Sequence, residues 1–133
     1  MTSYVDAVRS LHAGESGTLV RSDLFGLLAD EVEWQVAGSP DRLPWAGTVR
    51  GPEGVRSWLE RLNEHMEYER FELMEIYGDR DTVVELVNAS GRAAVSRRPF
   101  ESDLVRIWTF QAGKAKLVRS YYDTAAYERS FLG

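Results

Sequence analysis

The chain has 133 residues, no cysteine and a formal net charge of −5, from 16 basic and 21 acidic residues. This length suits one domain, 1–133, that can bury a real core. The acidic balance argues against a nucleic-acid surface, and the lack of cysteine excludes disulfides and thiolate chemistry. With only His12 and His65 there is no histidine pair at zinc-binding spacing. No apolar segment suits a membrane span or a secretory signal, so we expect a cytoplasmic protein without a membrane partner.

The first half of the chain predicts helices around one strand. Apolar residues recur at helical spacing over 5–11 and 24–28, which predicts two short helices. Residues 32–36 alternate apolar and polar and predict a strand. The Gly- and Pro-rich stretch 37–47, which carries Trp45, is typical of a loop, and 48–50 can form a short strand.

The second half predicts a meander of strands. Gly51-Pro52-Glu53 suits the start of an amphipathic helix, because proline is favoured in the first turn. Strand-like patterns follow, and residues 124–131 predict a closing helix. The order of elements predicts an α+β domain with helices on one face of a curved sheet. The predicted strands are 67–77, 82–92, 99–111 and 114–123.

The last hairpin decides which side chains share a face. A two-residue turn at Ala112-Gly113 would pair Gln111 with Lys114. In that register Arg106 lies opposite Arg119, and like charges so placed repel. They need an anion between them, such as Asp123, another acid or a ligand, or one must reach solvent. A slip of one residue would turn the side chains of one strand to the opposite face of the sheet relative to those of the other strand. The predicted shared face holds Ser102, Leu104, Arg106, Trp108 and Phe110 opposite Asp123, Tyr121, Arg119, Leu117 and Ala115.

Four segments resemble the NTF2-like superfamily, and within it the SnoaL-like and ketosteroid-isomerase-related proteins. They are ADEVEW (29–34), WAGTVRGPEGVRSWLERL (45–62), VRIWTFQAGKAKLVRSYYD (105–123) and the TAAY helix that follows. The resemblance covers nearly the whole chain. It implies a cone: a curved, mostly antiparallel sheet wrapped by about three helices of the N-terminal half around an apolar pocket. It also implies a homodimer through the outer sheet face and activities that need no metal or organic cofactor.

The ketosteroid isomerase mechanism is not implied, because its residues are absent. The aspartate base of those enzymes falls at about Val36, and their oxyanion-hole tyrosine falls near Ala7, with Tyr4 one turn away. Their protonated aspartic acid falls at about Arg106. The epoxide hydrolases of the superfamily add an Arg-x-Asp pair that strand 82–92 lacks, where Glu85 is among the few polar residues.

Asp123 is the predicted proton-transfer residue, because related cyclases and epoxide hydrolases keep a pocket aspartate at the end of the last strand. Its alternative role is to cap the helix 124–131. Arg106 is expected to bind or polarise a substrate oxygen, and a salt bridge is its alternative. Tyr121 is expected to donate a hydrogen bond to substrate, or else to the backbone. We expect both His12 and His65 to be exposed.

The predicted function is cofactor-independent acid/base chemistry on a small hydrophobic molecule: isomerisation, cyclisation, hydration or epoxide hydrolysis. The alternatives are a non-catalytic small-molecule-binding or dimerisation module and a protein–protein adaptor with a filled interior. The predicted pocket walls are large apolar side chains, with Trp45 as a candidate lid and core packing as the alternative. These wall residues are Trp34, Trp45, Trp58, Leu104 and Trp108.

Overall fold

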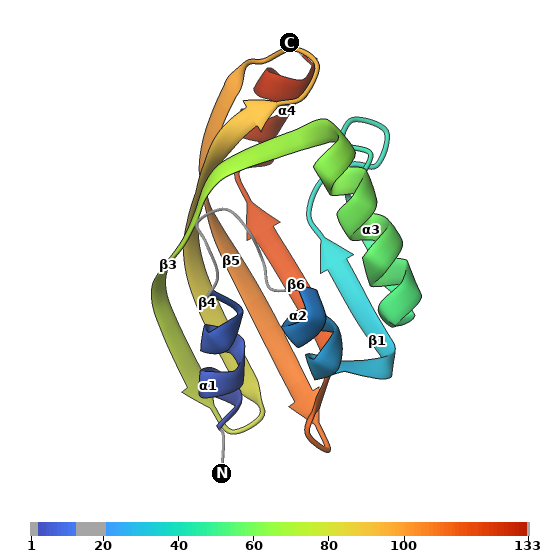
Figure 1. The fold of residues 1–133 in the computed structure, drawn as a ribbon, viewed down its shortest axis with the longest axis vertical. Helices are drawn as coiled ribbons and strands as arrows, with labels where there is room; N and C mark the ends of the chain where they lie inside the picture. Colours follow the sequence, from blue (N-terminus) through green and yellow to red (C-terminus); the bar gives the residue numbers. More distant parts are fainter. Residues whose placement is uncertain (1–2, 13–20, 133) are drawn as a thin grey trace.

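One curved sheet of six strands forms the body of the protein, in the order β2-β1-β6-β5-β4-β3 (Figure 1). The computed structural model describes residues 3–12 and 21–132. All neighbouring strands are antiparallel except β1 and β6, which are parallel. The strands are β1 (Leu28–Val36), β2 (Gly47–Arg50), β3 (Met66–Asp79), β4 (Thr82–Ala93), β5 (Pro99–Gln111) and β6 (Lys114–Tyr122).

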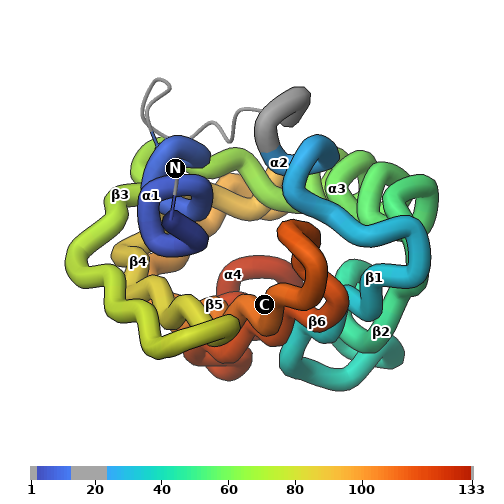
Figure 2. Tube along the Cα trace, turned by 90° about the horizontal axis from the view of Figure 1, so that it is seen from below, coloured from blue at the N-terminus to red at the C-terminus, as the bar shows by residue number. Residues whose placement is uncertain are grey.

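The helices α1, α2 and α3 lie against one face of this sheet, and Figure 2 shows them closing over its concave side. Helix α3 buries Trp58 and Leu62 among its apolar positions and carries Pro52 in its first turn. The α+β cone is therefore confirmed. Within the described residues no helix is long and apolar enough to cross a membrane. The helices are α1 (Tyr4–Arg9), a 3-10 turn η1 (Ser10–His12), α2 (Arg21–Leu27), α3 (Gly51–His65) and α4 (Thr124–Leu132).

The turn between β5 and β6 forms as predicted, but the register beyond it does not. Gln111 pairs with Lys114, and the two turn residues have φ values of 52° and 85°, as a tight hairpin turn requires. The register then shifts by one residue between Thr109 and Phe110, because β6 contains a bulge there. From that point the side chains of β6 point to the opposite faces from those predicted.

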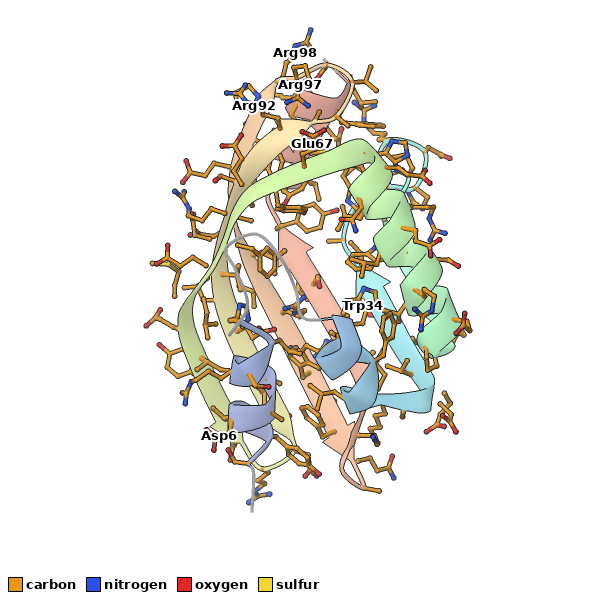
Figure 3. All side chains as sticks on the ribbon, viewed as in Figure 1. Asp6, Trp34, Glu67, Arg92, Arg97 and Arg98 are labelled. Carbon is orange, nitrogen blue, oxygen red and sulfur yellow. The ribbon has the colours of Figure 1, made fainter. Side chains whose placement is uncertain are left out.

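Tryptophan packing fills the space between α3 and the sheet. Trp34 of β1, labelled in Figure 3, is fully buried. Its ring lies against those of Trp58 and Trp108, with centroids 5.2 and 6.1 Å away. Its indole Nε1 has no hydrogen-bond partner within residues 3–12 and 21–132. This cluster closes one end of the interior, so the open space of the cone lies toward the other end, beside α4.

Candidate functional site

A cavity of about 240 Å³ lies between α3, the inner face of the sheet and α4. This volume is below the usual range for drug-sized ligands, so it suits a small molecule. Seven of its lining residues are apolar or aromatic, and six carry polar groups. The apolar ones are Val36, Trp45, Trp58, Leu59, Leu62, Phe71 and Leu104, and the polar ones are Asn63, Tyr68, Arg106, Ser120, Tyr122 and Tyr127.

Three tyrosines supply hydroxyl groups to the cavity wall. The hydroxyls of Tyr68 and Tyr127 are 3.0 Å apart, so one donates to the other and one proton remains to offer. Tyr122 donates to the carbonyl of Ala37 at 2.6 Å and accepts from Trp45 at 3.2 Å. Burial raises the pKa of Tyr122 to about 12 and raises the pKa of Tyr68 and Tyr127 further. All three therefore stay protonated at neutral pH.

Arg106 is the one charged side chain among the described residues that line the cavity. It forms a buried ion pair with Glu85. The two residues face each other across β4 and β5 and are 2% and 0% exposed. Arg106 Nε donates to Glu85 Oε1 at 2.6 Å, and Nη2 donates to Oε2 at 3.3 Å. Nη1 makes no hydrogen bond with a described residue. The guanidinium is thus fixed through two nitrogens, with the third available to a ligand.

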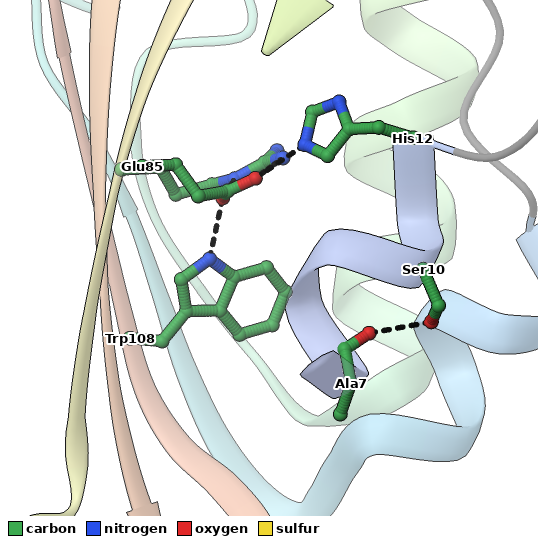
Figure 4. Close-up of polar contacts among 6 residues, drawn as sticks. Ala7, Ser10, His12, Glu85 and Trp108 are labelled. Atoms are coloured by element: carbon green, nitrogen blue, oxygen red, sulfur yellow. Dashed lines mark hydrogen bonds and ion pairs between the residues drawn. The ribbon is translucent and has the colours of Figure 1, made fainter. Parts of the chain in front are cut away.

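Two more donors converge on the Glu85 carboxylate (Figure 4). Trp108 Nε1 donates to Oε1 at 2.6 Å, and His12 Nε2 contacts Oε2 at 2.5 Å. Burial alone would raise the pKa of Glu85, but Arg106 and these hydrogen bonds lower it to about 2. Glu85 is therefore ionised at neutral pH, and its charge balances that of Arg106 inside the protein.

The predicted wall residues separate into two groups. Trp45, Trp58 and Leu104 line the cavity. Trp34 and Trp108 do not line it and are fully buried in the tryptophan packing below. Trp45 is also unlike a movable lid, because its carbonyl accepts a hydrogen bond from Trp58 Nε1 at 2.8 Å and it is 2% exposed.

Asp123 and Tyr121 lie outside the cavity, and the bulge in β6 is the reason. It turns Ser120 and Tyr122 inward and leaves Tyr121 47% exposed. Asp123 is exposed, and its Oδ1 accepts a hydrogen bond from the Ala126 backbone at 3.1 Å, as an N-cap does. The structure therefore places Asp123 as a helix cap, and of the three predicted catalytic residues it brings only Arg106 to the cavity.

The predicted clash between Arg106 and Arg119 does not occur. Arg106 lies opposite Ser120, while Arg119 lies on the outer face. The anion beside Arg106 is Glu85, which is the "another acid" of the three possibilities given for it above. A signal was present in the sequence: Glu85 alternates with Val83 and Val87, which marks an inward position where a carboxylate requires partners.

The exposure predicted for His12 is wrong, since its side chain is only 9% exposed. Its contact with Glu85 spans 73 positions of the chain, so no local pattern could reveal it. The cavity tyrosines Tyr68 and Tyr127 were missed for the same reason. Among the described residues no group of histidine, cysteine, aspartate and glutamate side chains could hold a metal ion.

Comparisons with known proteins agree with this architecture. An NTF2-like protein from Burkholderia xenovorans LB400 is 28% identical, with a TM-score of 0.77 over 95% of this chain and 90% of that one. An NTF2-like protein from Burkholderia thailandensis E264 is 24% identical, with a TM-score of 0.78 over 94% and 91%. TerC, co-crystallised with polyporic acid, is 20% identical, with a TM-score of 0.82 over 97% and 98%.

No curated protein matches the chain. The family model described as a SnoaL-like domain matches residues 7–118, which is most of its length. The chain therefore belongs to the SnoaL-like domain family.

Proposed function

We propose that the protein is a cofactor-independent enzyme that performs acid/base chemistry on a small, mostly apolar molecule in the cavity. The reaction class is an isomerisation, a cyclisation or a hydration, including epoxide hydrolysis. The buried guanidinium of Arg106 supports this proposal most. A fixed donor in a water-poor site stabilises negative charge that develops on a substrate oxygen, which is the largest single contribution in many enzymes.

The rest of the cavity wall suits the same chemistry. The aromatic and aliphatic walls exclude water and favour an apolar body. The spare hydroxyl proton of the Tyr68–Tyr127 pair and the Ser120 hydroxyl are neutral donors that can orient an oxygen without adding charge.

One observation favours a second candidate, a non-catalytic binding module. Among the described residues that line the cavity, none is an aspartate, a glutamate or a histidine. A wall without a proton-transfer group can bind a ligand and leave it unchanged. This candidate predicts binding without turnover.

Ligand binding can be measured by thermal shift against ketones, lactones, epoxides and aromatic acids, with polyporic acid among the probes. A ligand at about 100 times its Kd adds roughly 2.7 kcal/mol of stability, which raises the Tm by several degrees. We expect an uncharged carbonyl compound to give this shift, because Arg106 is already balanced by Glu85 and a buried anion would stay uncompensated.

Two neighbouring residues of β6 provide the matched variants. Ser120→Phe fills the cavity and should abolish the shift, whereas Tyr121→Phe changes only the outer face and should keep it. The absence of a shift with every probe, or its survival in Ser120→Phe, would count against the cavity as the binding site. In that case a protein–protein role becomes the better account.

We also propose that two copies of the chain pair through the outer face of the sheet. The middle of this face carries half-buried apolar side chains. Arg119 on the same face has a buried Nε without a hydrogen-bond partner among the described residues. The face also carries the acids Glu101 and Asp103, so a second copy related by a two-fold axis can offer a carboxylate to Arg119. The apolar side chains are Val84, Leu86, Val105, Ile107 and Leu117.

Sedimentation velocity measures this association. We expect a dimer in the wild type and a monomer in Ile107→Arg, because a charge at the centre of an apolar interface is desolvated without a partner. Val95→Arg is the matched control, since Val95 is 91% exposed and lies away from this face. A monomeric wild type at micromolar concentration would rule out a stable pair.

A further inference from the structure

Acid/base chemistry needs a group that moves a proton, and His12 is the best placed such group in the interior. Asp123 is exposed and occupied as a helix cap. Glu85 is ionised, and its two oxygens already accept from three residues. His12 is hydrogen-bonded to this carboxylate (Figure 4). Among the residues that contact Glu85, it is the one whose side chain can act as a base near neutral pH.

The hydrogen bond to Glu85 fixes the tautomer of the His12 ring. An ionised carboxylate can only accept, so Nε2 must carry the proton that spans the 2.5 Å contact. In the neutral ring Nδ1 then holds a lone pair. Nδ1 lies on the side of the ring away from Glu85 and makes no hydrogen bond with a described residue. This arrangement orients a histidine as a base.

His12 also lies next to the cavity wall. Its ring stacks on Phe71, with centroids 5.9 Å apart and planes 8° apart, and Phe71 lines the cavity. The guanidinium of Arg106 lies over the same Phe71 ring at 5.6 Å. One aromatic side chain and one carboxylate therefore hold the imidazole and the guanidinium side by side.

We propose that His12, oriented by Glu85, is the catalytic base of the site and abstracts a proton from the carbon beside a substrate carbonyl whose oxygen binds Arg106. This proposal rests on the proposed function. It assigns the proton-transfer group, which the residues that line the cavity do not include. Glu85 acts through His12 and Arg106 and is a positioning residue.

The step balances in atoms and charge. The C–H bond breaks and its proton goes to Nδ1, while the electron pair forms a carbon–carbon double bond and the carbonyl pair moves onto oxygen. The resulting enolate faces Arg106, and the new imidazolium faces Glu85. Arg106 and Glu85 are thus placed to stabilise the ion pair that the reaction creates. Return of a proton from Nδ1 to carbon completes an isomerisation or exchange.

Deuterium uptake tests the step without knowledge of the natural substrate. The probe is 2-tetralone, an uncharged bicyclic ketone with acidic hydrogens beside its carbonyl. Its exchange in D₂O is followed by proton NMR, and its binding by quenching of tryptophan fluorescence. We expect the wild type to accelerate exchange above the buffer rate.

The variants separate proton transfer from binding. His12→Gln should lower the protein-dependent exchange rate by about 100-fold or more, the usual contribution of a general base, with the Kd for the ketone changed less than about threefold. Glu85→Gln should lower the rate at saturating ketone more than it weakens binding. His65→Gln is the matched control, since His65 is the other histidine of the chain and its ring packs against Trp45 and Phe131 rather than beside Glu85.

Rescue and NMR keep the test decisive if a variant is unstable. Added imidazole should restore exchange in His12→Ala, which a purely structural role would not produce. In the wild type, labelled with ¹⁵N-histidine, 2-tetralone should shift the Nδ1 resonance of His12 and leave that of His65 unchanged.

Each outcome decides a different point. Ketone binding without accelerated exchange, or undiminished exchange in folded His12→Gln, overturns the role of His12 and leaves the cavity as a binding site. Failure of 2-tetralone and of every other carbonyl probe to bind overturns the proposed function as well.

Discussion

Glu85→Gln should lower the free energy of unfolding by about 3 to 5 kcal/mol, the usual loss when one partner of a buried ion pair is removed. The substitution leaves the Arg106 guanidinium buried without its counter-charge and sets an amide NH₂ group against donors from Trp108 and His12. A loss of this size is a large fraction of the stability of an ordinary domain. Urea denaturation followed by tryptophan fluorescence measures it.

Glu53→Gln is the matched control, because Glu53 also pairs with an arginine. Its partner is Arg56 at 3.5 Å, but the two side chains are 86% and 47% exposed on α3. Exposed pairs contribute at most about 1 kcal/mol. Equal losses in the two variants would show that Glu85 is not the buried anchor of the site.

The same carboxylate predicts how stability depends on pH. The pKa of Glu85 falls from 4.5, its ordinary value, to about 2 in the fold, so its contribution is complete above pH 4.5 and is lost as the pH falls toward 2. The shift corresponds to about 3 kcal/mol. The difference in unfolding free energy between wild type and Glu85→Gln should therefore shrink as the pH falls from about 7 to about 3.

The sequence was sufficient to predict the helices and strands, but not which side chains of β6 point into the interior. Alternation of apolar residues located the second half of β1, strand-like patterns located β3 to β6 to within about two residues, and Gly51-Pro52 marked the start of α3. The bulge between Thr109 and Phe110 could not be predicted, because one extra residue leaves the local pattern of alternation intact on each side. That single residue moved Asp123 and Tyr121 out of the site and brought Ser120 and Tyr122 into it.

The candidate site was predictable only where the chemistry was local. Arg106 stood out because an arginine on an apolar strand needs a partner. Its partner comes from a neighbouring strand and His12 from the N-terminal helical turn, and these pairings depend on the three-dimensional arrangement of the sheet. A buried charge thus predicts that a partner exists but not which residue supplies it.

Gly91→Ala should lower the free energy of unfolding by about 3 kcal/mol, at the upper end for an added methyl group in a packed interior. An ideal Cβ at Gly91 would lie 1.9 Å from the carbonyl oxygen of Glu67 and 2.9 Å from Cα of Tyr68. Both contacts are with backbone, so no side-chain rotation can relieve them. The strands β3 and β4 would have to separate at this pair.

Gly26→Ala is the matched control, because a Cβ there meets no heavy atom of the described residues within 4 Å outside its own helix, α2. Alanine in a helix is favoured over glycine by about 0.5 to 1 kcal/mol, so this variant should be slightly more stable than the wild type. Urea denaturation compares the three proteins. A Gly91→Ala variant within about 1 kcal/mol of the wild type would mean that the two strands can part here without loss.

The close approach at Gly91 also shapes the cavity. Gly91 pairs with Tyr68, and the register of β3 shifts immediately beyond, between Tyr68 and Arg70. A glycine opposite a bulge lets a strand bend sharply, and this bend directs the Tyr68 hydroxyl to Tyr127 of α4. If the strands separate in Gly91→Ala, the hydroxyl pair should part as well. Ketone binding should then weaken in this variant more than in Gly26→Ala, because the curvature of the sheet and the donors of the cavity depend on the same contact.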